Sequence, residues 1–145
     1  MTHHELLRKL GETAGIELEL SGVSTAAAKF DGDEVNFESN GERLYIYADI
    51  APSEGREADF GKLLELNNFF AGTDGAVIGL DRERGTFTLC RMVEGDVEYA
   101  AFERAVAGFV TALRLIRREL SEDEGSAPAP QPAFGHLHDR HLMQV

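Results

Sequence analysis

Residues 59–89, DFGKLLELNNFFAGTDGAVIGLDRERGTFTL, constrain the fold more than any other part of this chain. Apolar side chains at helical spacing predict an amphipathic helix over 57–71, and Leu66 and Phe69 make its apolar stripe wider than one sheet face needs. We expect Gly72 to end this helix and the following Asp-Gly pair to turn the chain. The apolar run 76–80 and the segment 86–93 then predict two strands joined by a polar loop. No catalytic constellation occurs in the stretch.

The first 50 residues predict one helix followed by three antiparallel strands. Leu6, Leu7 and Leu10 share one face of a helix over 2–14, and Thr2 with Glu5 fits a capping box. Asp-Gly at 31–32 and Asn-Gly at 40–41 are turn signals, because both pairs tolerate positive φ. We therefore expect strands at 23–30, 35–38 and 43–50.

Alternation assigns the two faces of the third of these strands. Leu44 and Ile46 should point one way, and Tyr45 and Tyr47 the other. Pro52 follows and should end the pattern.

The last 50 residues divide into a long helix and a tail. Phe102, Val106, Phe109 and similar residues recur at steps of three and four, which predicts a helix over 97–120. Residues 121–145 begin with acidic residues and carry three of the four prolines, so we expect a flexible Pro/acidic/His-containing tail. The element order is then α-β-β-β-α-β-β-α, which predicts an α+β fold with helices packed on an antiparallel sheet.

Composition limits the classes of function. A length of 145 residues is one domain's worth of chain, and a net charge of −12 disfavours nucleic acid and anionic lipid as partners. A basic or mixed-charge partner fits that charge, although acidity also simply favours solubility. No apolar run of eighteen residues occurs, the N-terminus lacks a signal-peptide core, and Cys90 is the single cysteine, so we expect a cytosolic protein.

Motifs for metal, phosphate or catalysis are weak. His136, His138 and His141 could bind zinc, but they lie in a Pro-rich segment that cannot pre-organise ligands. The Asp-Gly-Asp-Glu run at 31–34 fails the spacing of a calcium loop, since Val35 stands where its fifth position needs an oxygen ligand. The glycines at 72–79 leave a helix instead of entering one, which is the wrong polarity for a phosphate cradle. We therefore expect no cofactor, no metal and no enzyme, with a site assembled from scattered acids as the open alternative.

Excess apolar surface remains. Leu66, Phe69 and Phe70 exceed a one-sided stripe, and Tyr45 and Tyr47 face away from the apolar side of their strand. Each residue taken singly could be core or ordinary surface. Together they suggest an oligomer interface and a peptide-binding face, and a symmetric dimer is the commonest way to cover a self-complementary patch.

The order and spacing of several elements resemble the class I type III secretion chaperones, the Tir/CesT-like family of small acidic bacterial chaperones. The resemblance covers residues 1–120, with the tail longer than the basic pattern requires. The matching segments are ELLRKLG at 5–11, RLYIYA at 43–48, LLELNNFFAG at 63–72, GAVIGLD at 75–81, TFTL at 86–89 and the Phe102-x-x-Ala105-x-x-x-Phe109 helix.

The resemblance implies a cytosolic homodimer that binds the N-terminal chaperone-binding segment of a secreted effector without a cofactor, and keeps it soluble and export-competent. On the family's layout, the dimer interface would include Leu63, Leu66, Phe69 and Phe70. Candidates for the effector grooves are Leu7, Leu10, Val35, Phe37, Tyr45 and Tyr47. The alternative is a non-secretory protein-interaction or regulatory module of the same fold.

Overall fold

The protein is described by a computed structural model covering residues 1–94 and 96–125, with side chains through Ser121. Within those residues the helices are α1 His3–Ala14, α2 Phe60–Asn67 and α3 Tyr99–Gly125. Short 3-10 turns flank α2 at Glu57–Asp59 (η1) and Asn68–Phe70 (η2). The strands are β1 Thr25–Phe30, β2 Asp33–Ser39, β3 Arg43–Pro52, β4 Val77–Asp81 and β5 Thr86–Glu94. No described helix is long and apolar enough to cross a membrane.

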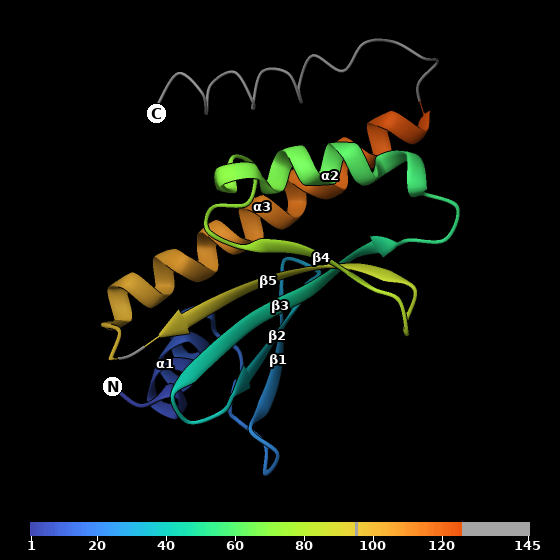
Figure 1. Ribbon diagram of the computed structural model, residues 1–145. Helices are drawn as coiled ribbons and strands as arrows, with labels where there is room; N and C mark the ends of the chain where they lie inside the picture. The colour runs from blue at the N-terminus through green and yellow to red at the C-terminus, as the bar shows by residue number, and fades with distance from the viewer. Residues whose placement is uncertain (95, 126–145) are drawn as a thin grey trace. The chain divides into compact units, whose positions relative to one another are not determined.

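The strands form a single sheet in the order β1-β2-β3-β5-β4 (Figure 1). The predicted α+β class, with its antiparallel sheet and its order of helices and strands, is confirmed. The chain also divides into two compact units. Unit 1 consists of Met1–Ala48 and Cys90–Val110, and unit 2 consists of Asp49–Leu89 and the described chain from Thr111 on.

In unit 1, the β1–β2 hairpin follows from its turn chemistry. The two turn residues, Asp31 and Gly32, have φ values of 52° and 90°. Two successive positive φ values match the right-handed twist of the flanking strands, and Asp-Gly adopts them at low cost. The turn sets the register that pairs Ala28 with Val35 and Ala26 with Phe37.

The core of unit 1 follows the predicted alternation and the predicted helical face. Leu44, Ile46 and Ala48 are fully buried on one side of β3, and Leu6, Leu7 and Leu10 are buried on α1. The Phe37 ring of β2 lies 6.4 Å from that of Phe102, which begins the buried face of α3. The predicted capping box is also present, because Thr2 N–H donates to Glu5 Oε2 at 2.8 Å and Glu5 N–H donates to Thr2 Oγ1 at 3.1 Å.

In unit 2, the amphipathic helix ends earlier than predicted. The sequence pattern extends it to residue 71, but α2 stops at Asn67, and Phe69 and Phe70 adopt φ values of 52° and 59°. The chain turns there so that the Gly72 N–H donates to the Leu66 carbonyl at 3.0 Å. α2 therefore ends ahead of Gly72, in a turn that is closed between Leu66 and Gly72.

The Asn67 side chain fastens this helix end to β4. Its Nδ2 donates to the Ile78 carbonyl at 3.1 Å, and its Oδ1 accepts from the Ile78 N–H at 2.8 Å. One amide therefore satisfies both main-chain groups of a single strand residue. Figure 1 shows α2 lying along β4, consistent with this link.

Other boundaries also differ from the prediction. β2 spans Asp33–Ser39 and not 35–38, and β3 includes Pro52, which was expected to follow the strand. β1 begins at Thr25 and not at residue 23, and α3 runs from Tyr99 to Gly125 and not from 97 to 120. Residues 121–124 contain neither glycine nor proline, so their acidity alone does not stop the helix. The rest of the predicted tail, with its three histidines, lies outside the described residues.

We expect Gly72→Ala to destabilise the protein. The new Cβ would collide with Leu66 Cδ2 and lie 3.3 Å from Leu66 Cβ, in a buried region. Overpacking of this kind costs roughly 1–3 kcal/mol, measurable by denaturant unfolding. The matched control is Gly61→Ala in α2, where the new Cβ meets nothing within 4 Å. Because alanine favours helix over glycine, this control should stabilise the protein by up to about 1 kcal/mol. Equal effects of the two substitutions would contradict the packing argument.

The Asn67 link is tested by Asn67→Asp. The carboxylate can still accept from Ile78 N–H, but it cannot donate to the Ile78 carbonyl. The free energy of unfolding should fall by roughly 1–3 kcal/mol at neutral pH. The loss should shrink at acid pH, where a protonated carboxyl can donate again. Asn68→Asp, at the neighbouring exposed position, should change stability by no more than about 0.5 kcal/mol. A loss that is the same at acid and neutral pH would refute the role given to the amide.

Candidate functional site

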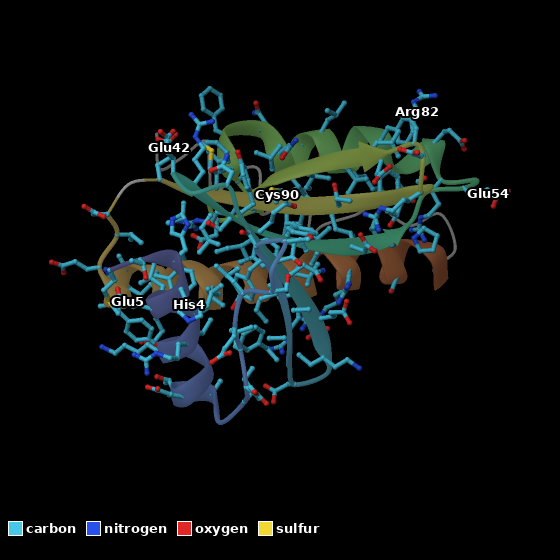
Figure 2. The ribbon with its side chains drawn as sticks, turned by 90° about the horizontal axis from the view of Figure 1, so that it is seen from below. His4, Glu5, Glu42, Glu54, Arg82 and Cys90 are labelled. Carbon is cyan, nitrogen blue, oxygen red and sulfur yellow. The ribbon has the colours of Figure 1, made fainter. Side chains whose placement is uncertain are left out.

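Reactive groups are sparse in the described part of the chain. No group of three or more His, Cys, Asp or Glu residues there could hold a metal ion. Cys90 is partly buried within β5 (Figure 2). Burial, and to a lesser degree the Glu38 carboxylate, raise the pKa of the Cys90 thiol, which keeps it protonated and weakly nucleophilic at neutral pH. The candidate sites of the described chain are therefore binding surfaces.

Exposed apolar side chains concentrate in unit 2. Six of the nine exposed large hydrophobic residues among those described lie between positions 60 and 80. A concentration of this kind is typical of an interaction site, whereas scattered single residues are ordinary. The six are Phe60, Leu64, Phe69, Phe70, Val77 and Leu80.

Part of this surface is hollowed into a groove between α2 and the β4–β5 hairpin, which we call the α2–β4 groove. Its volume is about 180 Å³. The Phe60 ring stands edge-on to the Phe87 ring, with centroids 6.0 Å apart. The Asn67 side-chain amide makes two hydrogen bonds to the main chain of Ile78. The lining residues are Phe60, Leu63, Leu64, Asn67, Ile78, Gly79, Leu80 and Phe87.

The structure separates the four predicted interface residues into two pairs. Phe69 and Phe70 are 69% and 53% exposed, and their place in an interface stays a prediction. Leu63 and Leu66 are only 5% and 2% exposed in the single chain, so their place in an interface stays a prediction. Their positions on α2 face the core of unit 2, where Leu66 lies against Gly72.

Sequence reasoning missed the exposure of Leu64, Phe60, Val77 and Leu80. Leu64 follows Leu63 directly, and a step of about 100° around the helix moves it from the buried side to the 68% exposed side. The continuous apolar run 76–80 gave no sign that Val77 is exposed. In β4, alternation of the side chains buries Ile78 and exposes Val77. The available signal for Val77 was the alternation itself, since successive side chains of a strand point to opposite faces.

The six predicted effector-groove residues also divide. Leu7, Leu10, Val35 and Phe37 are buried in the core of unit 1, and their role in an effector groove stays a prediction. Their apolar periodicity reflects packing of α1 and β2, which produces the same pattern as a binding face.

Tyr45 and Tyr47 lie on the opposite face of β3 and are partly exposed. They pair across to Glu38 and Asn36 of β2 respectively. This arrangement gives a partly polar face with two aromatic side chains.

A larger and more polar hollow lies in unit 1, with a volume of about 1020 Å³. His3 Nδ1 and Ser39 Oγ are 2.6 Å apart at its wall, and burial lowers the pKa of His3. Figure 2 shows His4 and Glu5 at the start of α1 and Glu42 on the β2–β3 turn. One arginine, Arg43, lines this hollow. Its lining also includes four carboxylate residues, which are Glu5, Glu42, Glu94 and Asp96.

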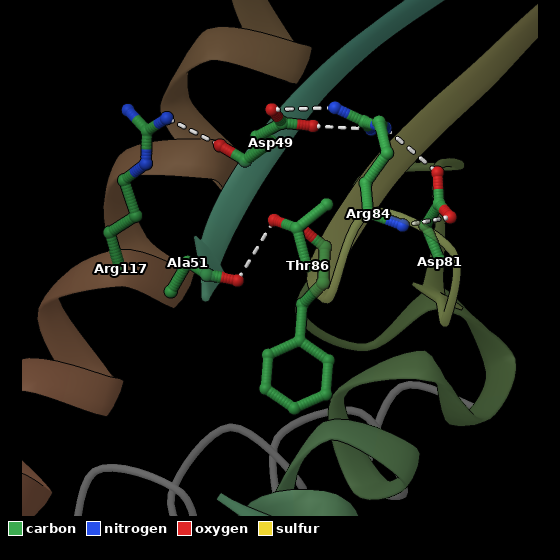
Figure 3. A network of polar contacts seen from close by, with 7 residues as sticks. Asp49, Ala51, Asp81, Arg84, Thr86 and Arg117 are labelled. Atoms are coloured by element: carbon green, nitrogen blue, oxygen red, sulfur yellow. Dashed lines mark hydrogen bonds and ion pairs between the residues drawn. The ribbon is translucent and has the colours of Figure 1, made fainter. Parts of the chain in front are cut away.

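An arginine cluster in unit 2 fixes the β4–β5 hairpin. Arg84 donates to both carboxylate oxygens of Asp49, at 2.8 and 3.0 Å, and to Asp81 Oδ2 at 2.8 Å (Figure 3). These two partners raise the pKa of the Arg84 guanidinium. Arg117 of α3 donates to the main-chain carbonyls of Asp49 and Ile50. The cluster therefore ties the end of β3 to the hairpin that carries Val77 and Leu80.

Solved structures share this fold. A chain of the HopA1–SchA chaperone–effector complex is 19% identical, with a TM-score of 0.65, over 79% of this chain and 91% of that one. A chain of the ExsC–ExsE complex is 22% identical, with a TM-score of 0.67, over 79% of this chain and 90% of that one. YbjN from E. coli, a candidate transcription regulator, is 15% identical, with a TM-score of 0.60, over 83% and 92%.

At these identities the solved structures establish the fold alone. No curated protein sequence is significantly similar to the chain. The sequence model of one family does match, over residues 5–117 and so over most of the chain. The protein therefore belongs to the Tir chaperone protein (CesT) family.

Proposed function

We propose that the protein is a cytoplasmic type III secretion chaperone. As a homodimer it binds the N-terminal segment of an effector and keeps that segment soluble and competent for export. The observation that carries the proposal is the CesT family match over residues 5–117. The structures of chaperone–effector complexes with the same fold support it. The proposal assigns the protein no catalytic step.

A second function is a protein-interaction or regulatory module outside secretion. YbjN, a candidate transcription regulator, has the same fold, which is the observation that favours this alternative. The two functions differ in the partner that the protein holds in its native host.

The exposed aromatic pair supports dimerisation. Phe69 and Phe70 both occupy the left-handed φ region, which is rare for bulky residues. Such conformations cost on the order of 1–3 kcal/mol each and persist only where surrounding contacts enforce them. Here the Gly72–Leu66 hydrogen bond closes the turn and presents two phenyl rings to solvent. A symmetric contact between two copies would bury those rings.

Unit 1 supplies features suited to an extended client segment. β1 lies at an end of the sheet order, so its outer edge can pair with a client main chain. Tyr45 and Tyr47 offer aromatic contacts on β3, which β2 separates from β1 in the sheet order. The carboxylates of the large hollow, together with the net charge of −12, favour basic residues in that segment.

The first test is purification from the native host, with mass spectrometry of the proteins that co-purify. We expect an effector, and we expect deletion of its N-terminal segment to abolish its recovery. The Tyr45→Ser/Tyr47→Ser double variant should weaken capture by about tenfold, equivalent to 1.4 kcal/mol. Val23→Ser, at an exposed residue of the same unit, should leave capture unchanged. Recovery of a regulatory protein in place of an effector would favour the second function.

Light scattering of the purified protein tests the dimer. We expect the mass of two chains, and a concentration-dependent shift to one chain for Phe69→Glu/Phe70→Glu, because charged side chains cannot be buried unpaired. Val23→Glu introduces one such charge at a 79% exposed position and should leave the dimer intact. A wild-type mass of one chain would refute dimerisation without bearing on client capture.

A further inference from the structure

The β2–β3 turn of unit 1 carries an exposed Asn-Gly pair, Asn40-Gly41, that the proposed function does not use. Gly41 has a φ value of 95°, and no Cβ shields its main-chain nitrogen. Such a nitrogen can attack the side-chain carbonyl carbon of the preceding asparagine, which closes a succinimide ring and expels ammonia. The reaction is promoted by a base that takes the proton of the nitrogen and by donors that hold the carbonyl oxygen.

A hydrogen-bonded path connects the Gly41 nitrogen to an imidazole. The Gly41 N–H donates to Ser39 Oγ at 3.2 Å, and Ser39 Oγ lies 2.6 Å from His3 Nδ1. Since the Ser39 oxygen accepts from Gly41, its own hydroxyl proton can be donated to His3 Nδ1. Burial lowers the pKa of His3, so its imidazole is neutral and able to accept a proton at neutral pH. The three groups form a relay from a main-chain N–H to a base.

The charges around His3 do not oppose its transient protonation. His3 lies in the wall of the large hollow of unit 1, where Arg43 Nε donates to Glu94 Oε1 at 3.0 Å. The other titratable and charged residues of that lining are Met1 with the amino group of the chain, His4, Glu5, Glu42 and Asp96. Because carboxylates outnumber the positive groups in this lining, an imidazolium meets no net repulsion there.

Two main-chain donors hold the Asn40 side-chain oxygen. Asn40 Oδ1 accepts from the Arg43 N–H at 2.8 Å and from the Glu42 N–H at 3.2 Å. Attack on Asn40 Cγ moves negative charge onto this oxygen, and fixed N–H donors stabilise such charge. The same hydrogen bonds restrict rotation of the side chain, which reduces the entropy that is lost on reaching the transition state.

We propose that Asn40-Gly41 is a self-modification site, at which the fold promotes conversion of Asn40 to aspartate and isoaspartate. The Gly41 nitrogen bonds to Asn40 Cγ while its proton moves to Ser39 Oγ and the Ser39 hydroxyl proton moves to His3 Nδ1. The electron pair of the carbonyl moves to Oδ1. As the carbonyl forms again, the Cγ–Nδ2 bond breaks, and the proton on His3 passes to Nδ2, which leaves as ammonia. Water then opens the succinimide at either carbonyl.

Both products change the surface of unit 1. Each adds a carboxylate directly before Gly41 and Glu42, which line a hollow that is already acidic. The aspartate product keeps an acceptor for the Glu42 and Arg43 N–H groups, so the turn persists. The isoaspartate product adds a methylene to the main chain, next to the register that pairs Ser39 with Leu44, and disturbs it. This inference goes beyond the proposed function and holds whichever client the protein binds.

Intact-mass spectrometry during incubation at neutral pH tests the site. We expect the mass gain of an amide-to-acid conversion together with release of ammonia, and peptide mapping should place aspartate and isoaspartate at position 40. Asn36, Asn67 and Asn68 are internal controls, because no glycine follows them, and they should stay amides. The folded protein should react about tenfold faster than the same protein in concentrated guanidinium chloride at the same pH, where the relay is absent. A folded rate equal to or below the unfolded rate would refute the proposal.

Two variants test the relay itself. Ser39→Ala removes its middle group, and His3→Gln keeps a hydrogen-bonding side chain that cannot carry the proton. Each should slow the folded reaction about tenfold and leave the rate in guanidinium chloride unchanged. His4→Gln, at the neighbouring position of α1, should leave both rates unchanged.

A wild-type folded rate in His3→Gln, with the fold intact by circular dichroism, would show that His3 is not the base and would overturn the relay. None of these outcomes involves an effector, so failure here leaves the chaperone function standing.

Discussion

The hydrogen bonds between the Asn67 amide and Ile78 determine how unit 2 presents its surface. They hold the end of α2 at one fixed place along β4. The turn that follows then places Gly72 against Leu66 and forces two phenylalanines into left-handed backbone conformations. The hydrogen bonds of a partly buried amide to both main-chain groups of one strand residue are costly to break, because a main-chain group would be left without a hydrogen-bond partner. The exposed aromatic pair and the groove both depend on this link.

Local chemistry explains which parts of the fold were predictable. The Asp31-Gly32 turn and the alternation of Leu44 and Ile46 with Tyr45 and Tyr47 depend on intrinsic φ preference and period, and both are confirmed. The end of α2 depends on contact with residues farther along the chain. Nothing in the local sequence assigns Phe69 a positive φ, so the helical pattern continued past the true end.

The candidate surfaces were harder to predict for a related reason. Apolar periodicity indicates that one face of a helix or strand is apolar, but it does not distinguish a face buried in the core from one buried in an interface. Leu66 and Phe69 extend the same stripe, yet Leu66 is buried and Phe69 is exposed. Val35 and Phe37 belong to the core for the same reason that made them candidates. Tyr45 and Tyr47 are partly exposed, unlike Val35 and Phe37. Alternation along β3 predicted that they lie on the face opposite the buried Leu44 and Ile46.

The two compact units are interleaved along the chain. β3, β5 and α3 each begin in one unit and end in the other, so each unit requires two separated stretches of sequence. Any contiguous fragment that contains one unit whole also contains part of the other. Limited proteolysis or truncation will therefore not release one of them as an independent folding piece, and a deletion in one unit removes strand or helix length from its neighbour.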